Sequence, residues 1–240
     1  MAKAVRQRVP AVLQLTGIVA PNQMIKDLML RYGVKPERLV VAAYGVDVAD
    51  RRVDAVRTLP SSPLRVGFIG TLAHHKGCHV LLEAFNTLPK GCATLKIFGG
   101  EADFPDYTEK LRRLAGDSDE IAFCGTFPTE AIGRILDHLD VLVVPSVWNE
   151  NTPLVVYSAQ ASRCPIVASD VPGIAAVIQD NVDGILFEPG SVQGLAAALS
   201  RLVAEPSILV DLSLACRVPK SVSGYVDELT SIWNGQWRGA

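Results

Sequence analysis

Short apolar runs alternate with stretches of helical periodicity through most of this sequence. Residues 141–144 read VLVV and residues 166–168 read IVA. A strand that is apolar at every position, and not only at every second one, must be covered on both faces, as in a parallel sheet flanked by helices. The alternation therefore predicts an α/β fold with a doubly wound, parallel, Rossmann-like sheet.

The first clear strand–helix unit joins the β-rich residues 65–70 to residues 77–88, whose apolar side chains recur at helical spacing. Similar units follow, whereas residues 1–60 and 206–240 fit the pattern less well. Ligands of such sheets bind beyond the carboxyl ends of the strands. Polar or glycine-rich segments follow the predicted strands at residues 71–77, 99–100, 125–126 and 146–153.

Composition limits the classes of function. The chain has 240 residues, 49% hydrophobic and 20% charged, which is enough to bury the core of one large domain. The formal net charge is −2 and no basic stripe is interleaved with aromatic residues, so nucleic-acid binding is not expected.

Cysteine usage and hydropathy bear on location. The five cysteines lack metal-binding spacing and are typical of free thiols in a reducing compartment. No apolar stretch approaches the ~20 residues of a transmembrane segment. Gln14 and Thr16 interrupt the apolar run near the N-terminus, so a signal peptide is not favoured. We expect a cytoplasmic protein, with peripheral association at the inner membrane left open.

The segment GTLAHHKG, residues 70–77, lies between a predicted strand and a predicted helix, a position that suits phosphate binding. Lys76 would supply a cation, although a solvated lysine at a helix start is the alternative. The segment matches neither GxGxxG nor GxxxxGK[ST], which disfavours an NAD-dependent enzyme and a Walker-type site.

The histidines give weaker signals. His75 and His79 are four residues apart, but nothing supplies a third ligand, so no metal site is predicted. His74 and His138 are interpreted as surface or helix-capping residues.

A similar strand-to-helix junction occurs in the segment PSVWNENTPLVVYS, residues 145–158. Thr152 is the predicted N-cap and Pro153 the first helical residue, which leaves the N–H groups of Leu154 and Val155 for an anion. Glu150 just before the helix and a lysine at the neighbouring junction would form a cleft for a phosphorylated, hydroxyl-rich ligand. On spacing alone, Glu150 as an exposed residue near the cap remains an alternative.

Three stretches together, residues 67–85, 95–100 and 121–199, resemble the C-terminal, donor-binding half of GT-B glycosyltransferases of the retaining family called group 1 or family 4. The similarity extends over residues 20–235. It implies that residues 1–60 are a remnant of the interdomain segment and linker. Residues 61–218 would form the nucleotide-sugar-binding domain, and residues 219–240 a C-terminal helix. The N-terminal acceptor domain would be largely missing.

The resemblance assigns roles to particular positions. Lys76 corresponds to the phosphate-binding lysine and Glu150 to the glutamate that contacts the donor sugar. The second glutamate of the family, which usually holds the ribose hydroxyls, is replaced by Ser158, and this weakens the nucleotide site. The other donor-binding residues that the resemblance implies are Gly70, Thr71 (where an arginine is often found), His75, Gly125, Thr126, Asn151, Thr152, Leu154 and Val155, with Phe127 also near the base.

The predicted function is therefore binding of a nucleotide-diphosphate sugar, as the donor half of a retaining enzyme that transfers a hexosyl group to a glycan, lipid or small-molecule acceptor. The resemblance implies no cofactor and no metal bound by the protein. An acceptor domain on another chain would be a partner, and this chain alone would be weakly active or inactive. The alternative is a non-catalytic donor-like domain that pairs with a separately encoded glycosyltransferase half.

Overall fold

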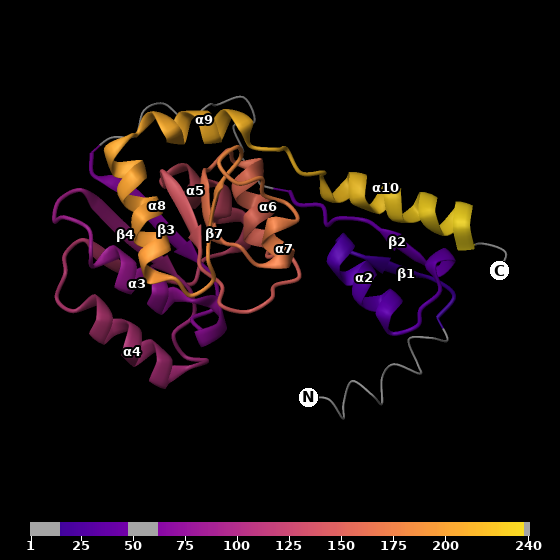
Figure 1. Ribbon diagram of the computed structural model, residues 1–240, viewed down its shortest axis with the longest axis horizontal. Coiled ribbons are helices and arrows are strands. Elements are labelled where there is room, and N and C mark those ends of the chain that lie inside the picture. Colours follow the sequence, from indigo (N-terminus) through magenta and orange to yellow (C-terminus); the bar gives the residue numbers. More distant parts are fainter. Residues whose placement is uncertain (1–14, 48–61, 238–240) are drawn as a thin grey trace. The chain divides into compact units, whose positions relative to one another are not determined.

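The computed structural model describes residues 15–47 and 62–237, which fall into two compact units (Figure 1). The larger unit lies within residues 47–219, and the smaller one combines residues 15–46 with residues 220–237. Residues 1–14, which include the start of the N-terminal apolar run, and residues 48–61, which include most of the predicted linker, lie outside the described residues. Within the described ranges, no helix has the length and apolarity needed to cross a membrane.

The larger unit is built on a parallel sheet of six strands in the order β5-β4-β3-β6-β7-β8. The strands are β3 (Leu64–Ile69), β4 (Ala93–Phe98), β5 (Ile121–Gly125), β6 (Val141–Val144), β7 (Ile166–Ser169) and β8 (Ile185–Phe187). The predicted doubly wound sheet is confirmed. The chain builds outward from β3 through β4 to β5, then crosses to β6 on the other side of β3. Sheets of this kind leave a crevice for a ligand where the strand order reverses, here between β3 and β6.

Helices cover both faces of this sheet (Figure 1). They are α3 (Cys78–Phe85), α4 (Pro105–Ala115), α5 (Ile132–Asp137), α6 (Leu154–Ala161), α7 (Pro172–Ala175), α8 (Val192–Ala204) and α9 (Ser207–Ala215). One apolar cluster includes Leu81 of α3 and Leu199 of α8, while the other includes Leu136 of α5 and Ile174 of α7. All four side chains have no exposed surface. Burial on both faces explains why β6 is apolar throughout and why β7 is apolar up to its last residue, Ser169.

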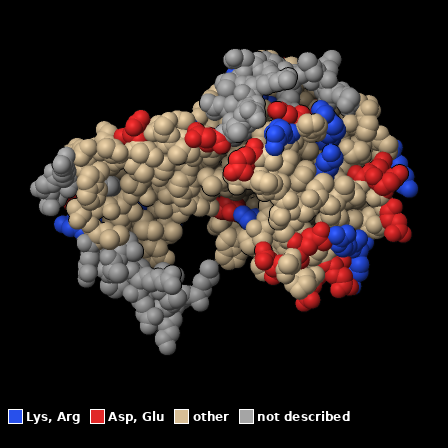
Figure 2. Space-filling model, turned by 180° about the vertical axis from the view of Figure 1, so that it is seen from behind, with Lys and Arg blue, Asp and Glu red and all other residues tan. Residues whose placement is uncertain are grey.

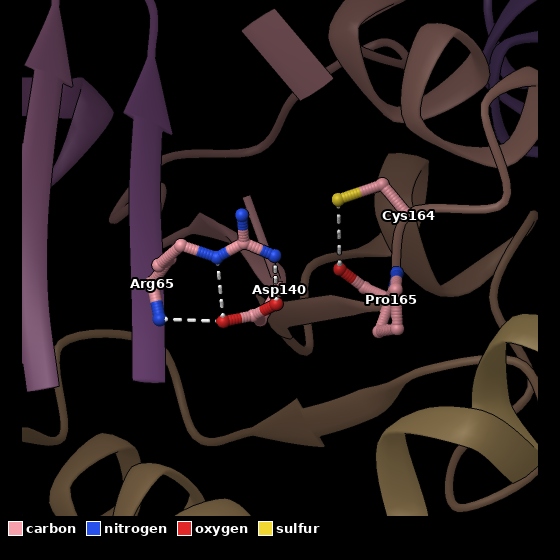
Figure 3. Close-up of polar contacts among 4 residues, drawn as sticks. All are labelled: Arg65, Asp140, Cys164 and Pro165. Carbon is pink, nitrogen blue, oxygen red and sulfur yellow. Dashed lines mark hydrogen bonds and ion pairs between the residues drawn. The ribbon is translucent and has the colours of Figure 1, made fainter. Parts of the chain in front are cut away.

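An ion pair fixes β3 against β6 at the amino ends of the strands (Figure 3). The carboxylate of Asp140 accepts Arg65 Nη2 at 2.6 Å, Nε at 3.1 Å and the Arg65 backbone N–H at 2.8 Å. The hydrogen bond to Asp140 raises the pKa of Arg65. Because Asp140 is 95% buried, the pair is only partly screened by solvent and holds the two central strands in register.

The smaller unit contains two parallel strands, β1 (Ile18–Ala20) and β2 (Leu39–Val41), with the helices α2 (Gln23–Arg31) and α10 (Val222–Ile232). A 3-10 turn, Pro36–Arg38, precedes β2, and a π-helical turn, Trp233–Trp237, follows α10. The Val46 N–H donates to the Lys220 carbonyl at 3.0 Å. A Cβ on Gly45 would lie 2.3 Å from the Ser221 carbonyl oxygen, so glycine is needed for this close approach.

The surface of the larger unit carries both signs of charge. On the face shown in Figure 2, acidic and basic side chains are interspersed over this unit. This mixture agrees with the composition of the whole chain, which has 23 Lys and Arg residues and 25 Asp and Glu residues.

Candidate functional site

Two loops meet at the carboxyl ends of β3 and β6. The loop after β3 contains a 3-10 turn, His74–Lys76, whose His75 carbonyl accepts the Val147 N–H of the other loop at 2.9 Å. Gly77 has a φ of +72°, and a Cβ there would lie 1.7 Å from the Pro145 carbonyl oxygen. Only glycine therefore allows the two loops to approach this closely.

The two charged residues singled out by the sequence are in contact across this junction. Lys76 Nζ lies 2.6 Å from Glu150 Oε1, and Ser146 Oγ donates to the same oxygen at 3.0 Å. The Lys76 and Glu150 side chains are 25% and 15% exposed, so solvent reaches the pair only in part. Since both contacts use Oε1, the other carboxylate oxygen is left, among the residues described, to accept a hydrogen bond from a ligand.

The loop that carries Glu150 rests on the backbone after β7. Thr152 Oγ1 donates to the Gly173 carbonyl at 2.9 Å, and a Cβ on Gly173 would lie 1.8 Å from the Glu150 carbonyl oxygen. The Thr152 hydroxyl therefore makes a tertiary contact, and its predicted role as helix N-cap is wrong. The N-cap is Pro153 and the helix begins at Leu154, one residue later than predicted.

The first turn of α6 presents backbone donors that have no partner within the helix. Leu154 and Val155 are its first two residues, where helix geometry provides no partner for the N–H groups. Both residues line the same cavity as Lys76. The positive end of the helix dipole and the lysine therefore favour an anion in this cavity.

Two adjoining cavities, each of about 310 Å³, lie over the strand ends and share Ile69, Gly70 and Thr71. We name the first the charged lobe; its other lining residues are Phe68, Lys76, Val143, Val144, Ser146, Pro153, Leu154 and Val155. We name the second the aromatic lobe; its other lining residues are Phe98, Gly99, Gly100, Asp103, Thr126 and Phe127.

The aromatic lobe has a ring pair and closely packed backbone. The rings of Phe98 and Phe127 meet edge to face with their centroids 5.6 Å apart. A Cβ on Gly99 would lie 2.2 Å from the Gly70 carbonyl oxygen, so the ends of β3 and β4 pack without side chains between them. Together the lobes suit an elongated ligand with an anionic centre beside the lysine and a flat ring beside the phenylalanines.

The described residues contain no group of three or more His, Cys, Asp or Glu side chains that could hold a metal ion. The groups that the site offers a ligand are a lysine, a carboxylate, hydroxyl groups and backbone N–H groups.

Comparison with known proteins identifies the family. Residues 63–205 match the family model described as "Glycosyl transferases group 1". The chain belongs to the group 1 glycosyltransferases. The predicted resemblance to a GT-B domain of this family is confirmed.

Two curated relatives illustrate the extent of the match. The D-inositol 3-phosphate glycosyltransferase of Corynebacterium aurimucosum is 31% identical over 202 residues, which is 78% of this chain and 48% of the relative. The amylovoran biosynthesis glycosyltransferase AmsK of Erwinia amylovora is 30% identical over 206 residues, covering 82% and 49%. This group 1 glycosyltransferase chain thus spans about half the length of the curated relatives it matches.

Solved structures share the fold. Anabaena Alr3699/HepE in complex with UDP and glucose has a TM-score of 0.83 and 19% identity, over 96% of this chain and 66% of that one. A glycosyltransferase from Rickettsia africae has a TM-score of 0.85 and 18% identity, over 98% of this chain and 68% of the Rickettsia chain. At these identities the likeness supports the fold and not the ligand.

The residues predicted for the site of this group 1 glycosyltransferase fall into two sets. Those that line a lobe are Gly70, Thr71, Lys76, Thr126, Phe127, Leu154 and Val155. Glu150 does not line the charged lobe but bonds to two residues that do, Lys76 and Ser146.

The remaining predicted residues lie behind or beside the lobes. His75 and Asn151 are exposed, and His75 contributes its backbone carbonyl to the loop junction. The Gly125 carbonyl accepts the Gly99 N–H at 2.9 Å and so supports the aromatic lobe. Ser158 is 7% exposed, and its hydroxyl donates to the Leu154 carbonyl of its own helix at 3.2 Å.

The histidines near the site form a different pair from the one considered in the sequence. His79 stacks on His74, not His75, with ring centroids 4.5 Å apart, and its Nδ1 lies 2.8 Å from the Tyr107 hydroxyl. Burial, then the charges of His74 and Lys110, lowers the pKa of His79 to about 4. Burial also raises the pKa of Tyr107.

Sequence reasoning missed several residues that shape the site. Ser146 had a signal, because a polar residue directly follows the apolar run 141–145 in a segment marked as a strand end. No signal in the sequence indicated that Gly173 and Gly77 must be glycine. In both cases the need arises because backbone of another segment packs against the glycine. Asp103 was also missed; it enters the aromatic lobe from the loop before α4.

Proposed function

We propose that the larger unit binds a nucleotide-diphosphate sugar and acts as the donor half of a retaining glycosyltransferase. The observation that carries the proposal is the contact between Lys76 and Glu150 beside the start of α6. It places a cation and the N–H groups of the first helical turn in the charged lobe, with a carboxylate bonded to the cation. The lysine and the N–H groups can bind a diphosphate, and the carboxylate can accept hydrogen bonds from the hydroxyl groups of a sugar.

Each group has a definite task in this proposal. Lys76 and the N–H groups of Leu154 and Val155 neutralise the diphosphate, which gains negative charge as the leaving group. The free oxygen of Glu150 accepts a hydroxyl of the transferred hexosyl group and orients it. The aromatic lobe receives the nucleoside base, with Phe127 and Thr126 beside it.

The relatives guide the choice of ligand and the rest of the machinery. HepE has been solved with UDP-glucose, which makes UDP-glucose the first donor to test. We propose that the acceptor, a glycan, a lipid or a small molecule, is held by an acceptor domain on another chain. Transfer then requires both parts, and this chain alone turns over donor weakly or not at all.

No metal bound by the protein is needed, because the lysine and helix end supply the positive charge. We place the protein in the cytoplasm, because its five cysteines are free thiols.

Calorimetric titration tests donor binding. We expect UDP-glucose to bind wild-type protein, and Lys76→Met to weaken binding by at least ~10-fold, because a charged hydrogen bond contributes about 1.5–3 kcal/mol. Lys90→Met is the matched control, since Lys90 is exposed on the loop before β4. GDP and ADP sugars form further arms. Absence of heat with every nucleotide sugar would refute the proposal.

One observation favours a second candidate function, a non-catalytic partner of a separate glycosyltransferase half. Position 158 has a serine and therefore no carboxylate for the ribose hydroxyls. The Ser158 hydroxyl donates its own proton to the Leu154 carbonyl. Ser158→Glu distinguishes the two functions. If the site is otherwise intact, the new carboxylate strengthens UDP binding by about 10-fold or more. Unchanged, undetectable nucleotide binding in both proteins would favour the non-catalytic partner.

A further inference from the structure

A separate cavity of about 220 Å³ lies between β4 and α5, away from the charged lobe. Its lining residues are Lys96, Phe98, Ala131, Arg134, Ile135 and His138. All three side chains with ionisable groups are basic. The cavity shares only Phe98 with the aromatic lobe and no residue with the charged lobe.

The cavity exists because helices leave part of one sheet face uncovered. Along β4, Leu95 and Ile97 are buried in the core, whereas Lys96 between them is exposed on the opposite face. Ala122, the partner of Lys96 on the edge strand β5, is exposed as well. The short helix α5 borders this open area and contributes the other wall.

The positive charge in the cavity is not neutralised. Within the described ranges, no ion pair joins Lys96 or Arg134 to a carboxylate, whereas Arg65, Lys76 and Arg112 each have such a partner. Glu130 and Asp137 lie on neighbouring turns but do not line the cavity.

His138 can add a third charged donor. Its Nδ1 lies 2.7 Å from the Arg134 carbonyl oxygen, which can only accept, so Nδ1 carries a proton. Nε2 is then the ring nitrogen that is left to contact a ligand, and the imidazolium form would donate there to an anion. His138 is exposed and lies at the C-cap of α5, in agreement with its interpretation as a surface or helix-capping residue.

We propose that this cavity is a binding site for a phosphate group. Two or three converging cations suit a dianion better than a carboxylate. The volume suits one phosphate group and a small part of the molecule that carries it, with Phe98 and Ile135 as apolar contacts. The phosphate belongs either to a soluble phosphate monoester or to a phospholipid headgroup. This site is independent of donor binding.

Titration with inorganic phosphate, followed by NMR, tests the proposal. Lys76→Met protein is used so that the donor cleft does not compete, and the His138 ring C–H signals, assigned with His138→Gln, are monitored. We expect a saturable shift. Lys96→Met and Arg134→Met weaken binding by roughly 10-fold each. Lys96→Arg retains it, and so does the control Lys90→Met.

A second arm distinguishes the two sources of phosphate. Wild-type protein is sedimented with phosphatidylcholine vesicles that contain or lack phosphatidic acid. Binding that needs phosphatidic acid, Lys96 and Arg134 supports the lipid source; phosphate binding without sedimentation supports the soluble source. Absence of a saturable His138 shift overturns the proposal, as does a shift that survives both methionine substitutions. Displacement of phosphate by UDP-glucose in wild-type protein would also overturn it, because the anion would then lie in the donor cleft.

Discussion

The contact between Lys76 and Glu150 leads to a prediction about competition between protein and ligand. With no ligand bound, the carboxylate already neutralises the lysine at 2.6 Å. When a diphosphate binds Lys76, the attraction between Lys76 and Glu150 is weakened, and the diphosphate is repelled by the negative charge of Glu150. Glu150→Gln removes both costs, so we expect this variant to bind UDP more tightly than the wild type does.

The size of the effect follows from the exposure of the pair. Two charges about 4 Å apart attract by about 4 kcal/mol at an effective dielectric constant near 20, whereas exposed pairs contribute about 0–1 kcal/mol. The Lys76 and Glu150 side chains are 25% and 15% exposed, so their attraction energy lies between these limits. The cost of desolvating the two charges lowers the net stabilisation further. We take about 1 kcal/mol, which corresponds to roughly fivefold tighter UDP binding.

The sugar responds in the opposite direction. UDP-glucose loses a charged acceptor for one of its hydroxyls in Glu150→Gln, which costs about 1.5–3 kcal/mol. The preference for UDP-glucose over UDP therefore falls by at least ~10-fold. Calorimetry with both ligands measures the two changes. Glu205→Gln, at an exposed position after α8, controls for the loss of one negative charge. UDP binding by Glu150→Gln that equals or falls below that of wild-type protein would refute the reasoning.

Three further predictions concern the scaffold. A Cβ on Gly173 would lie 1.8 Å from the Glu150 carbonyl oxygen, so Gly173→Ala should lower the free energy of unfolding by about 1–3 kcal/mol and abolish calorimetric UDP binding. Gly235→Ala should change neither, because a Cβ there would meet no atom within 4 Å among the described residues outside its own helical turn. Asp140→Asn leaves a guanidinium without its charged partner and should cost about 1–3 kcal/mol in urea unfolding, with UDP affinity unchanged. The pKa of His79 is about 4 in the folded chain and 6.5 in the unfolded one, so the unfolded state binds more protons between these values. Stability should therefore fall as pH drops from 6.5 to 4, and less steeply in His79→Gln; equal slopes in urea unfolding would contradict this assignment.

Much of the fold could be predicted from the sequence. Strands such as β6 are apolar at every position, and only a sheet covered on both faces buries them fully. The rule that ligands bind beyond the carboxyl ends of strands then located the loops of Lys76 and Glu150. The order of the strands could not be obtained in this way, because periodicity describes each segment by itself and not which segments are neighbours.

The sequence by itself therefore determined the class of fold, the family and the two loops that form the candidate site. Only the tertiary structure decided the contacts within it. Lys76 and Glu150 are 74 residues apart and meet because β3 and β6 are adjacent. The local pattern around Thr152 indicated a helix cap, yet its hydroxyl bonds to the Gly173 carbonyl, since the loop packs there. Such contacts depend on backbone segments brought together from distant parts of the chain, and no local spacing encodes them.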